Sequence, residues 1–172
     1  MTVLQKLLAM LILRSAPQDL PYSPVLTGQL AVMYLLTGLI VLQTTLNPED
    51  LYAGLLLGLI VQYVFTWLVL GALKLRARFI QTFAAMMGVG LLFNLMSWPV
   101  FSTLSDASNS DSLKATMSLI FLMLISWEVL VKAHIFRHAM EMKMFSALAL
   151  SFSLFFISVA FSQLLFPVEA AG

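Results

Sequence analysis

The 172-residue chain is 61% hydrophobic and 10% charged, with a net charge of +1 and no cysteine. Soluble domains average about 45–50% apolar and about 25% charged residues, so this composition excludes a soluble fold that needs a polar surface. The balanced charge argues against nucleic acid as a partner, and the lack of cysteine excludes disulfide scaffolds and thiolate chemistry. An integral membrane protein remains, as the mean hydropathy of +0.98 indicates.

Residues 1–24 are expected to form an N-terminal unit outside the membrane-spanning part. A narrow polar stripe on an otherwise apolar surface predicts an amphipathic helix over residues 1–14 that lies in the membrane interface. The alternative is a segment that packs under the bundle as an incomplete sixth element. The stripe consists of Thr2, Gln5, Lys6 and Ala9, and the following prolines, Pro17, Pro21 and Pro24, predict an extended strap.

Residues 25–172 are expected to form a transmembrane domain with five membrane-spanning helices. Each of five apolar runs is about as long as a bilayer crossing requires, roughly 17–25 residues. Backbone polar groups in lipid must be satisfied within the segment, so these runs predict an all-α, polytopic helix bundle. The runs are Val25–Leu46, Leu51–Leu73, Phe79–Phe101, Leu113–Val131 and Met144–Phe166.

The distribution of basic residues predicts the orientation of the bundle. With five spans, every Lys and Arg except Lys114 lies in the N-terminal segment or near the second-to-third and fourth-to-fifth connections. Basic residues concentrate on the cytoplasmic side of membrane proteins. We therefore expect a cytoplasmic N-terminus and a periplasmic C-terminus.

A few polar side chains within the spans are candidates for a functional site. Glu128 lies in the fourth span with Lys132 four residues later, on the same helical face. This arrangement predicts either a proton or cation relay or an interfacial ion pair in which Lys132 reaches the headgroups. In both cases, the Glu128 carboxyl should meet Lys132 or face the bundle interior. Three amides, Gln29, Gln62 and Asn94, could bond across helices or line a shared polar pocket.

Small residues on three spans are typical of helix-packing seams. Gly54 and Gly58 form a GxxxG pattern that lets another helix approach closely, and Gly88 with Ala84 does the same in the third span. Three serines fall on one face of the fifth span: Ser151, Ser158 and Ser162.

His134, His138 and Glu141 have the spacing of metal ligands on one face of a continuing helix. The alternative is a helical extension with two interfacial histidines and an Arg137–Glu141 ion pair. Because a zinc hydrolase would have a glutamate directly after the first histidine, where Ile135 stands, no metal or other cofactor is expected. No nucleophile–base pattern is visible, so an enzyme is not expected either.

The segment WEVLVKAHIFRHAMEMKMFSALALSF (Trp127 to Phe152) resembles the fourth and fifth spans of the Yip1-like membrane family. That resemblance implies a short cytoplasmic N-terminal segment, five closely spaced spans and an external C-terminus. The strap PQDLPYSP resembles small proteobacterial membrane proteins, which implies a bacterial cell inner membrane.

Two functions fit these observations. The first is a non-enzymatic scaffold or accessory subunit whose packing seams contact other membrane proteins or a second copy of the chain. The second is a small oligomeric transporter or channel that uses Glu128 and the intramembrane amides. Paired intramembrane charges or broken helices would favour the second.

Overall fold

The computed structural model describes residues 1–45 and 50–166, and these residues form helices joined by turns and bends. Five helices are long and apolar enough to cross a membrane, so the expected all-α, multi-pass bundle is confirmed. Leu46, the expected end of the first span, lies outside the described residues. The α-helices are α1 (Val3–Leu11), α2 (Pro24–Thr45), α3 (Leu51–Ala72), α4 (Phe79–Ser105), α5 (Asp111–Met140) and α6 (Met144–Leu165); the short 3-10 helices are η1 (Pro17–Asp19) and η2 (Arg76–Arg78).

Two spans are longer than their apolar runs. α4 includes Pro99 and ends at Ser105, beyond the expected Phe101. The apolar run of the fourth span ends at Val131, and α5 continues to Met140 as the expected helical extension. The added segment of α5 contains no glycine or proline, and it remains helical because it buries apolar side chains against the rest of the bundle: Ala133, Ile135, Phe136 and Ala139.

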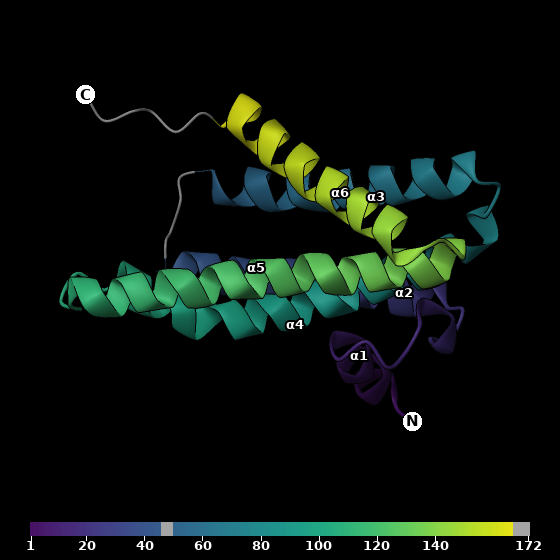
Figure 1. The fold of residues 1–172 in the computed structure, drawn as a ribbon. Helices are drawn as coiled ribbons and strands as arrows, with labels where there is room; N and C mark the ends of the chain where they lie inside the picture. The colour runs from purple at the N-terminus through teal and green to yellow at the C-terminus, as the bar shows by residue number, and fades with distance from the viewer. Residues whose placement is uncertain (46–49, 167–172) are drawn as a thin grey trace.

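The long helices form two layers (Figure 1). In one layer α2, α4 and α5 lie side by side, with the most extensive contact between α2 and α4. In the other layer α6 crosses α3 obliquely and moves away from α5 along its length. α4 provides the longest continuous buried stretch of the described residues, because its residues from Thr82 to Gly90 are all buried.

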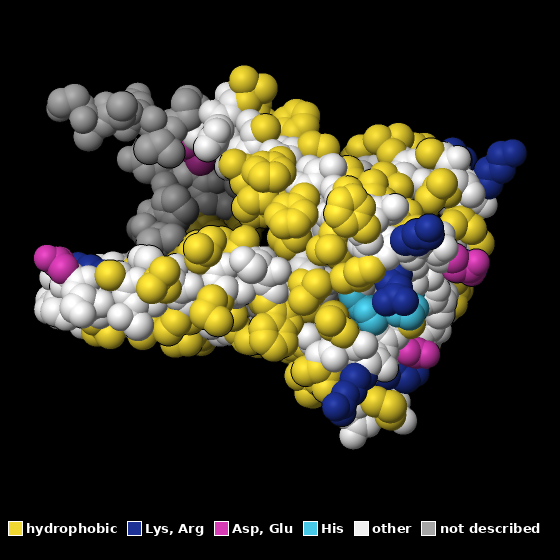
Figure 2. Space-filling view, viewed as in Figure 1, with side chains coloured by type: hydrophobic (Ala, Val, Ile, Leu, Met, Phe, Trp, Pro, Cys, Tyr) yellow, Lys and Arg dark blue, Asp and Glu magenta, His cyan; other side chains and the backbone are white. Residues whose placement is uncertain are grey.

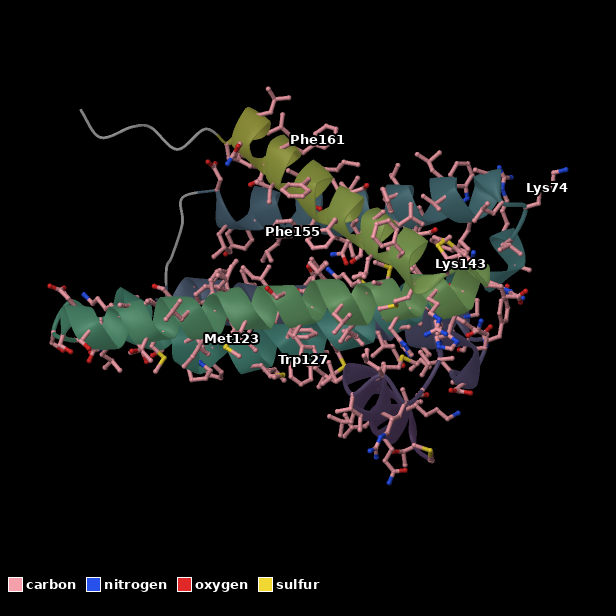
Figure 3. All side chains as sticks on the ribbon, viewed as in Figure 1. Lys74, Met123, Trp127, Lys143, Phe155 and Phe161 are labelled. Atoms are coloured by element: carbon pink, nitrogen blue, oxygen red, sulfur yellow. The ribbon has the colours of Figure 1, made fainter. Side chains whose placement is uncertain are left out.

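The two ends of the bundle differ in charge (Figure 2). Lys74 and Lys143 lie at the same end, as Figure 3 shows. We call this the basic end and the other the opposite end. The described basic residues near the basic end are Lys6, Arg14, Lys74, Arg76, Arg78, Arg137 and Lys143, whereas Asp50, Asp106, Asp111 and Lys114 lie at the opposite end.

α1 combines features of both expected arrangements of the N-terminal segment. It begins with a capping box in which the Thr2 hydroxyl accepts from the Gln5 backbone and the Gln5 side chain accepts from the Thr2 backbone. Leu7 and Met10 are buried against the bundle, whereas Leu4 and Leu8 are exposed. One apolar stripe of α1 therefore packs on the protein, and the other is free to face lipid.

The expected strap contains the 3-10 turn η1 and is bonded to the long helices. Gln81 Nε2 on α4 donates to the carbonyl of Leu20 at 2.6 Å, and Gln18 Nε2 donates to the carbonyl of His138 at 2.5 Å. Leu20 is buried. Residues 15–20 thus connect α1 to the basic end of α4 and α5.

Candidate functional site

The predicted contact between Glu128 and Lys132 is present on α5. Lys132 Nζ lies 2.7 Å from Glu128 Oε1, and the two side chains are 15% and 29% exposed. Their separation of four residues places them on one helical face. An isolated charge is costly in a hydrocarbon environment, so the pairing allows both groups to remain charged within a span.

This ion pair lines a polar cavity of about 200 Å³ between four helices. Residues of α2, α3, α5 and α6 form its wall, and Figure 3 shows Phe155 between α6 and α5 whereas Phe161 points away. A water molecule needs only about 10–15 Å³ of such space, so the cavity has room for several waters or a small solute. The polar cavity is lined by Tyr34, Gly58, Gln62, Ile125, Glu128, Val129, Lys132, Ser151, Leu154, Phe155 and Ser158.

Gln62 contributes a hydrogen-bond acceptor without a partner to this cavity. Its side chain is 5% exposed, and its Nε2 donates to Tyr34 Oη at 3.2 Å and to the Gly58 carbonyl at 3.4 Å. Rotating the amide would set Oε1 against that carbonyl, so the observed orientation is the favourable one. Oε1 has no hydrogen-bond partner among the described residues, a state that costs about 1–3 kcal/mol in a dry interior.

Tyr34 adds a hydrogen-bond donor. Its hydroxyl oxygen accepts the bond from Gln62, and the described residues offer no acceptor to the hydroxyl proton. Together Tyr34 and Gln62 bring one donor and one acceptor without protein partners to the cavity wall, although the Gln62 oxygen is itself almost fully buried. Sequence reasoning missed Tyr34, because an aromatic residue within an apolar run carries no signal that distinguishes it from a lipid-facing one.

The serines of α6 have different roles rather than forming one seam. Ser151 Oγ donates to the Val129 carbonyl of α5 at 2.7 Å and joins the two helices. Ser158 Oγ donates to the Leu154 carbonyl of its own helix at 2.9 Å and lines the cavity. Ser162 lines a second hollow, closer to the opposite end.

Asn94, which the sequence grouped with the intramembrane polar residues, does not line the cavity. Its Nδ2 donates to the Tyr34 carbonyl at 3.2 Å and to Thr37 Oγ1 at 3.4 Å. These bonds connect α4 to α2 behind Tyr34. Of the five polar candidates within the spans, the structure therefore brings together Glu128, Lys132 and Gln62. Gln29 is exposed on α2.

The glycines expected in packing seams behave in two ways. A Cβ added to Gly54 or Gly58 would meet no neighbouring atom within 4 Å, so no described helix of this chain approaches them closely. Gly88 has a close neighbour, because an added Cβ would lie 2.5 Å from Leu7 Cδ2. That neighbour belongs to α1 rather than to another span.

The three residues with metal-ligand spacing do not converge. His134 and His138 have ring centroids 4.4 Å apart, but His134 Nε2 lies 3.0 Å from the Ser15 carbonyl. Glu141 follows the end of α5 in a left-handed conformation, with φ 54°, so it leaves the helical face. Its carboxylate pairs with Arg78 instead of the expected Arg137.

These features define a multi-pass membrane protein with a polar cavity inside one chain. Comparison with protein-family models, curated proteins and solved structures finds no match. The resemblance to the Yip1-like family therefore stays a prediction.

Proposed function

We propose that this protein is a small transporter or channel that binds a small polar solute in the cavity at Glu128 and Lys132. The observation that supports this proposal is the unpartnered Gln62 Oε1 beside an ion pair in one intramembrane cavity. Buried acceptors are normally satisfied, so an unpartnered acceptor on a residue of the cavity wall favours a ligand or water that supplies a donor. The cavity lies within a single chain, so the proposed site is complete without a second copy.

The charge balance of the cavity indicates the class of solute. Glu128 and Lys132 neutralise each other at 2.7 Å, so the site offers no net attraction to an ion. Moving an unpaired ion into a low-dielectric site is costly. A zwitterion places a charge opposite each partner, and a neutral solute uses the free donor and acceptor. We therefore propose neutral or zwitterionic solutes with a hydrogen-bond donor.

The proposed location is a bacterial inner membrane, with the basic end in the cytoplasm. The support is the gathering of Lys and Arg at that end, which positive-inside orientation favours. The cavity then lies toward the cytoplasmic side of the bilayer, because Lys132 is close to the basic end of α5.

Liposome swelling tests this function without knowledge of the natural solute. Purified protein is reconstituted into liposomes, which are diluted into iso-osmotic alanine, lactamide or sodium lactate. These three solutes are similar in size and differ in charge. We expect alanine or lactamide to enter faster than into empty liposomes, and lactate to show no such increase. Swelling equal to that of empty liposomes for all three would favour the scaffold function instead.

Matched variants connect any permeation to the cavity. Gln62→Leu removes the free acceptor and should slow solute entry about tenfold, as loss of about 1.4 kcal/mol of binding implies. Leu56→Ala is the control, because Leu56 lies on the same helix but is exposed on the lipid side. Equal loss in both variants would show that the cavity is not the route.

A further inference from the structure

A second hollow of about 300 Å³ lies closer to the opposite end of the bundle than the polar cavity does. It is also bounded by α2, α3 and α6, and it carries a carboxylate, a hydroxyl and a glycine backbone on its wall. We call this hollow the outer groove; its lining residues are Leu42, Asp50, Leu51, Gly54, Leu55, Ser162 and Phe166.

The outer groove and the polar cavity are one helical turn apart on two walls. On α3, Gly54 lines the groove and Gly58 lines the cavity. On α6, Ser162 lines the groove and Ser158 lines the cavity. Four residues of α-helix correspond to about 6 Å, so the two hollows follow one another along the same pair of helices.

Glycine keeps the space between these two hollows open. Apart from its chain neighbours and the backbone of α3 itself, no atom of the described residues lies within 4 Å of where a Cβ would stand on Gly54 or Gly58, so a larger side chain would project into open space there. Gln62 lies four residues after Gly58, on the same face of α3, and carries the unpartnered Oε1. This face of α3 therefore leads from the exposed Asp50 to the buried Gln62 Oε1, which has no hydrogen-bond donor.

Toward the basic end, α3 is packed against α5 and α4. Phe65 of α3 contacts Phe136 of α5, with ring centroids 6.0 Å apart. Thr66 Oγ1 lies 3.3 Å from Met86 Sδ, and both side chains are fully buried. Next along this face of α3, Leu70 is also buried. Access to the cavity along α3 is thus blocked on the side of the basic end.

We infer that the outer groove and the polar cavity form one water-filled vestibule, open at the opposite end and closed beyond Lys132. This inference rests on the proposed function and adds that the solute is water-borne and enters from the end that carries Asp50.

Cysteine labelling tests the vestibule directly, because the chain has no native cysteine. Single cysteines are placed at Gly54, Gly58, Ser158 and Ser162, and the protein in lipid nanodiscs is treated with a membrane-impermeant thiol reagent. Cysteines at Ile60 and Phe156 are matched controls, since both positions are exposed on the outside of α3 and α6. Thiols react as thiolates, which form in water, so vestibule positions should react at least about tenfold faster than controls.

Blocking variants identify the direction of entry. Gly54→Leu should slow labelling of Ser158→Cys by filling the groove in front of it. Ala53→Leu is the control, because Ala53 is exposed on the adjacent face. Labelling of the vestibule cysteines at the control rate, or only by a lipid-soluble maleimide, would overturn the vestibule. Rapid labelling without solute-dependent swelling would instead keep the vestibule and reject the proposed transport.

Discussion

Glu128 and Lys132 keep their charges within a span because each neutralises the other. Their exposures of 29% and 15% mean that neither is fully screened by water. Removing one partner of a buried pair leaves an uncompensated charge and costs about 3–5 kcal/mol in fully buried cases. Replacing both partners with apolar residues of similar size is often neutral for stability.

The pair therefore predicts non-additive effects on stability. Glu128→Gln and Lys132→Met should each lower the thermal unfolding midpoint in detergent. The larger decrease is expected in the variant whose remaining charged side chain is less hydrated. The double variant should recover most of that loss. A double variant whose destabilisation equals the sum of the two single effects would show that the groups do not interact. Thermal unfolding followed by intrinsic tryptophan fluorescence measures all three.

Asp19 predicts an acid-sensitive contact at the N-terminal strap. The backbone N–H of Ala16, the hydroxyl of Ser15 and the charge of Lys6 lower the pKa of Asp19 below its ordinary value of 3.8. Its ionised form therefore stabilises the folded strap above pH 3.8, and that contribution is lost as the pH falls through the lower, folded pKa. Hydrogen exchange of residues 15–20, corrected for intrinsic rates, should rise in this acid range.

A variant separates this contact from general acid effects. Asp19→Asn should raise exchange in residues 15–20 at neutral pH, because a capping carboxylate of this kind contributes about 0.5–2 kcal/mol. Asp106→Asn is the control, since the Asp106 carboxylate bonds only within its own loop at the opposite end. If Asp19→Asn leaves exchange at neutral pH unchanged, the carboxylate does not hold the strap.

At the scale of the helices, Gly88 determines how α1 sits on the bundle. A Cβ at this position would overlap both terminal methyl groups of Leu7, which is buried between α1 and α4. Gly88→Val should displace α1 and expose the bonds after Lys6 and Arg14 to trypsin. Gly58→Ala should leave cleavage unchanged, because no atom lies near that Cβ position. Adding Leu7→Ala to Gly88→Val should restore protection, and failure to do so would show that the two residues do not share one space.

The lengths of the helices show what an apolar run predicts and what it does not. The length of each apolar run identified the five spans, because a bilayer crossing requires a minimum apolar length. It placed the end of the fourth span at Val131, whereas the continuing helix was expected from the polar residues after it, among them His134 and His138. Helix continuity requires backbone hydrogen bonds rather than apolar side chains, so α5 continues to Met140.

At the scale of the whole molecule, only the local part of the site could be predicted from sequence. The contact between Glu128 and Lys132 was predicted because residues four apart on one helix lie next to each other on the same face. Tyr34 and Gln62 meet across two helices, at 3.2 Å, through a relative rotation and depth of α2 and α3 that no local pattern encodes. For the same reason Gly54 and Gly58 resembled a packing seam, whereas the structure places them on hollows.

The orientation of the molecule gives the last prediction. α6 begins beside Lys143 at the basic end and runs toward the opposite end, so an odd number of crossings separates the basic N-terminal segment from the C-terminal side. Each Lys or Arg near an anionic leaflet contributes about 1 kcal/mol, and Lys114 is the one basic residue of the described opposite end. A reporter fused after Gly172 should therefore be periplasmic, and one inserted between Arg76 and Arg78 should be cytoplasmic.

Neutralising basic residues tests whether they determine this orientation. Replacing Lys74, Arg76 and Arg78 with glutamine removes the densest basic cluster of the chain, so a fraction of the molecules should insert with the C-terminal reporter inside. Replacing Asp106 and Asp111 with asparagine is the matched control, because acidic residues contribute little to orientation. If the wild-type C-terminal reporter and the Arg76–Arg78 reporter are both cytoplasmic, one of the five helices does not cross the membrane. If the C-terminal reporter is cytoplasmic and the Arg76–Arg78 reporter periplasmic, the bundle is inserted in the inverted orientation. The vestibule would then have to be reached from the other side.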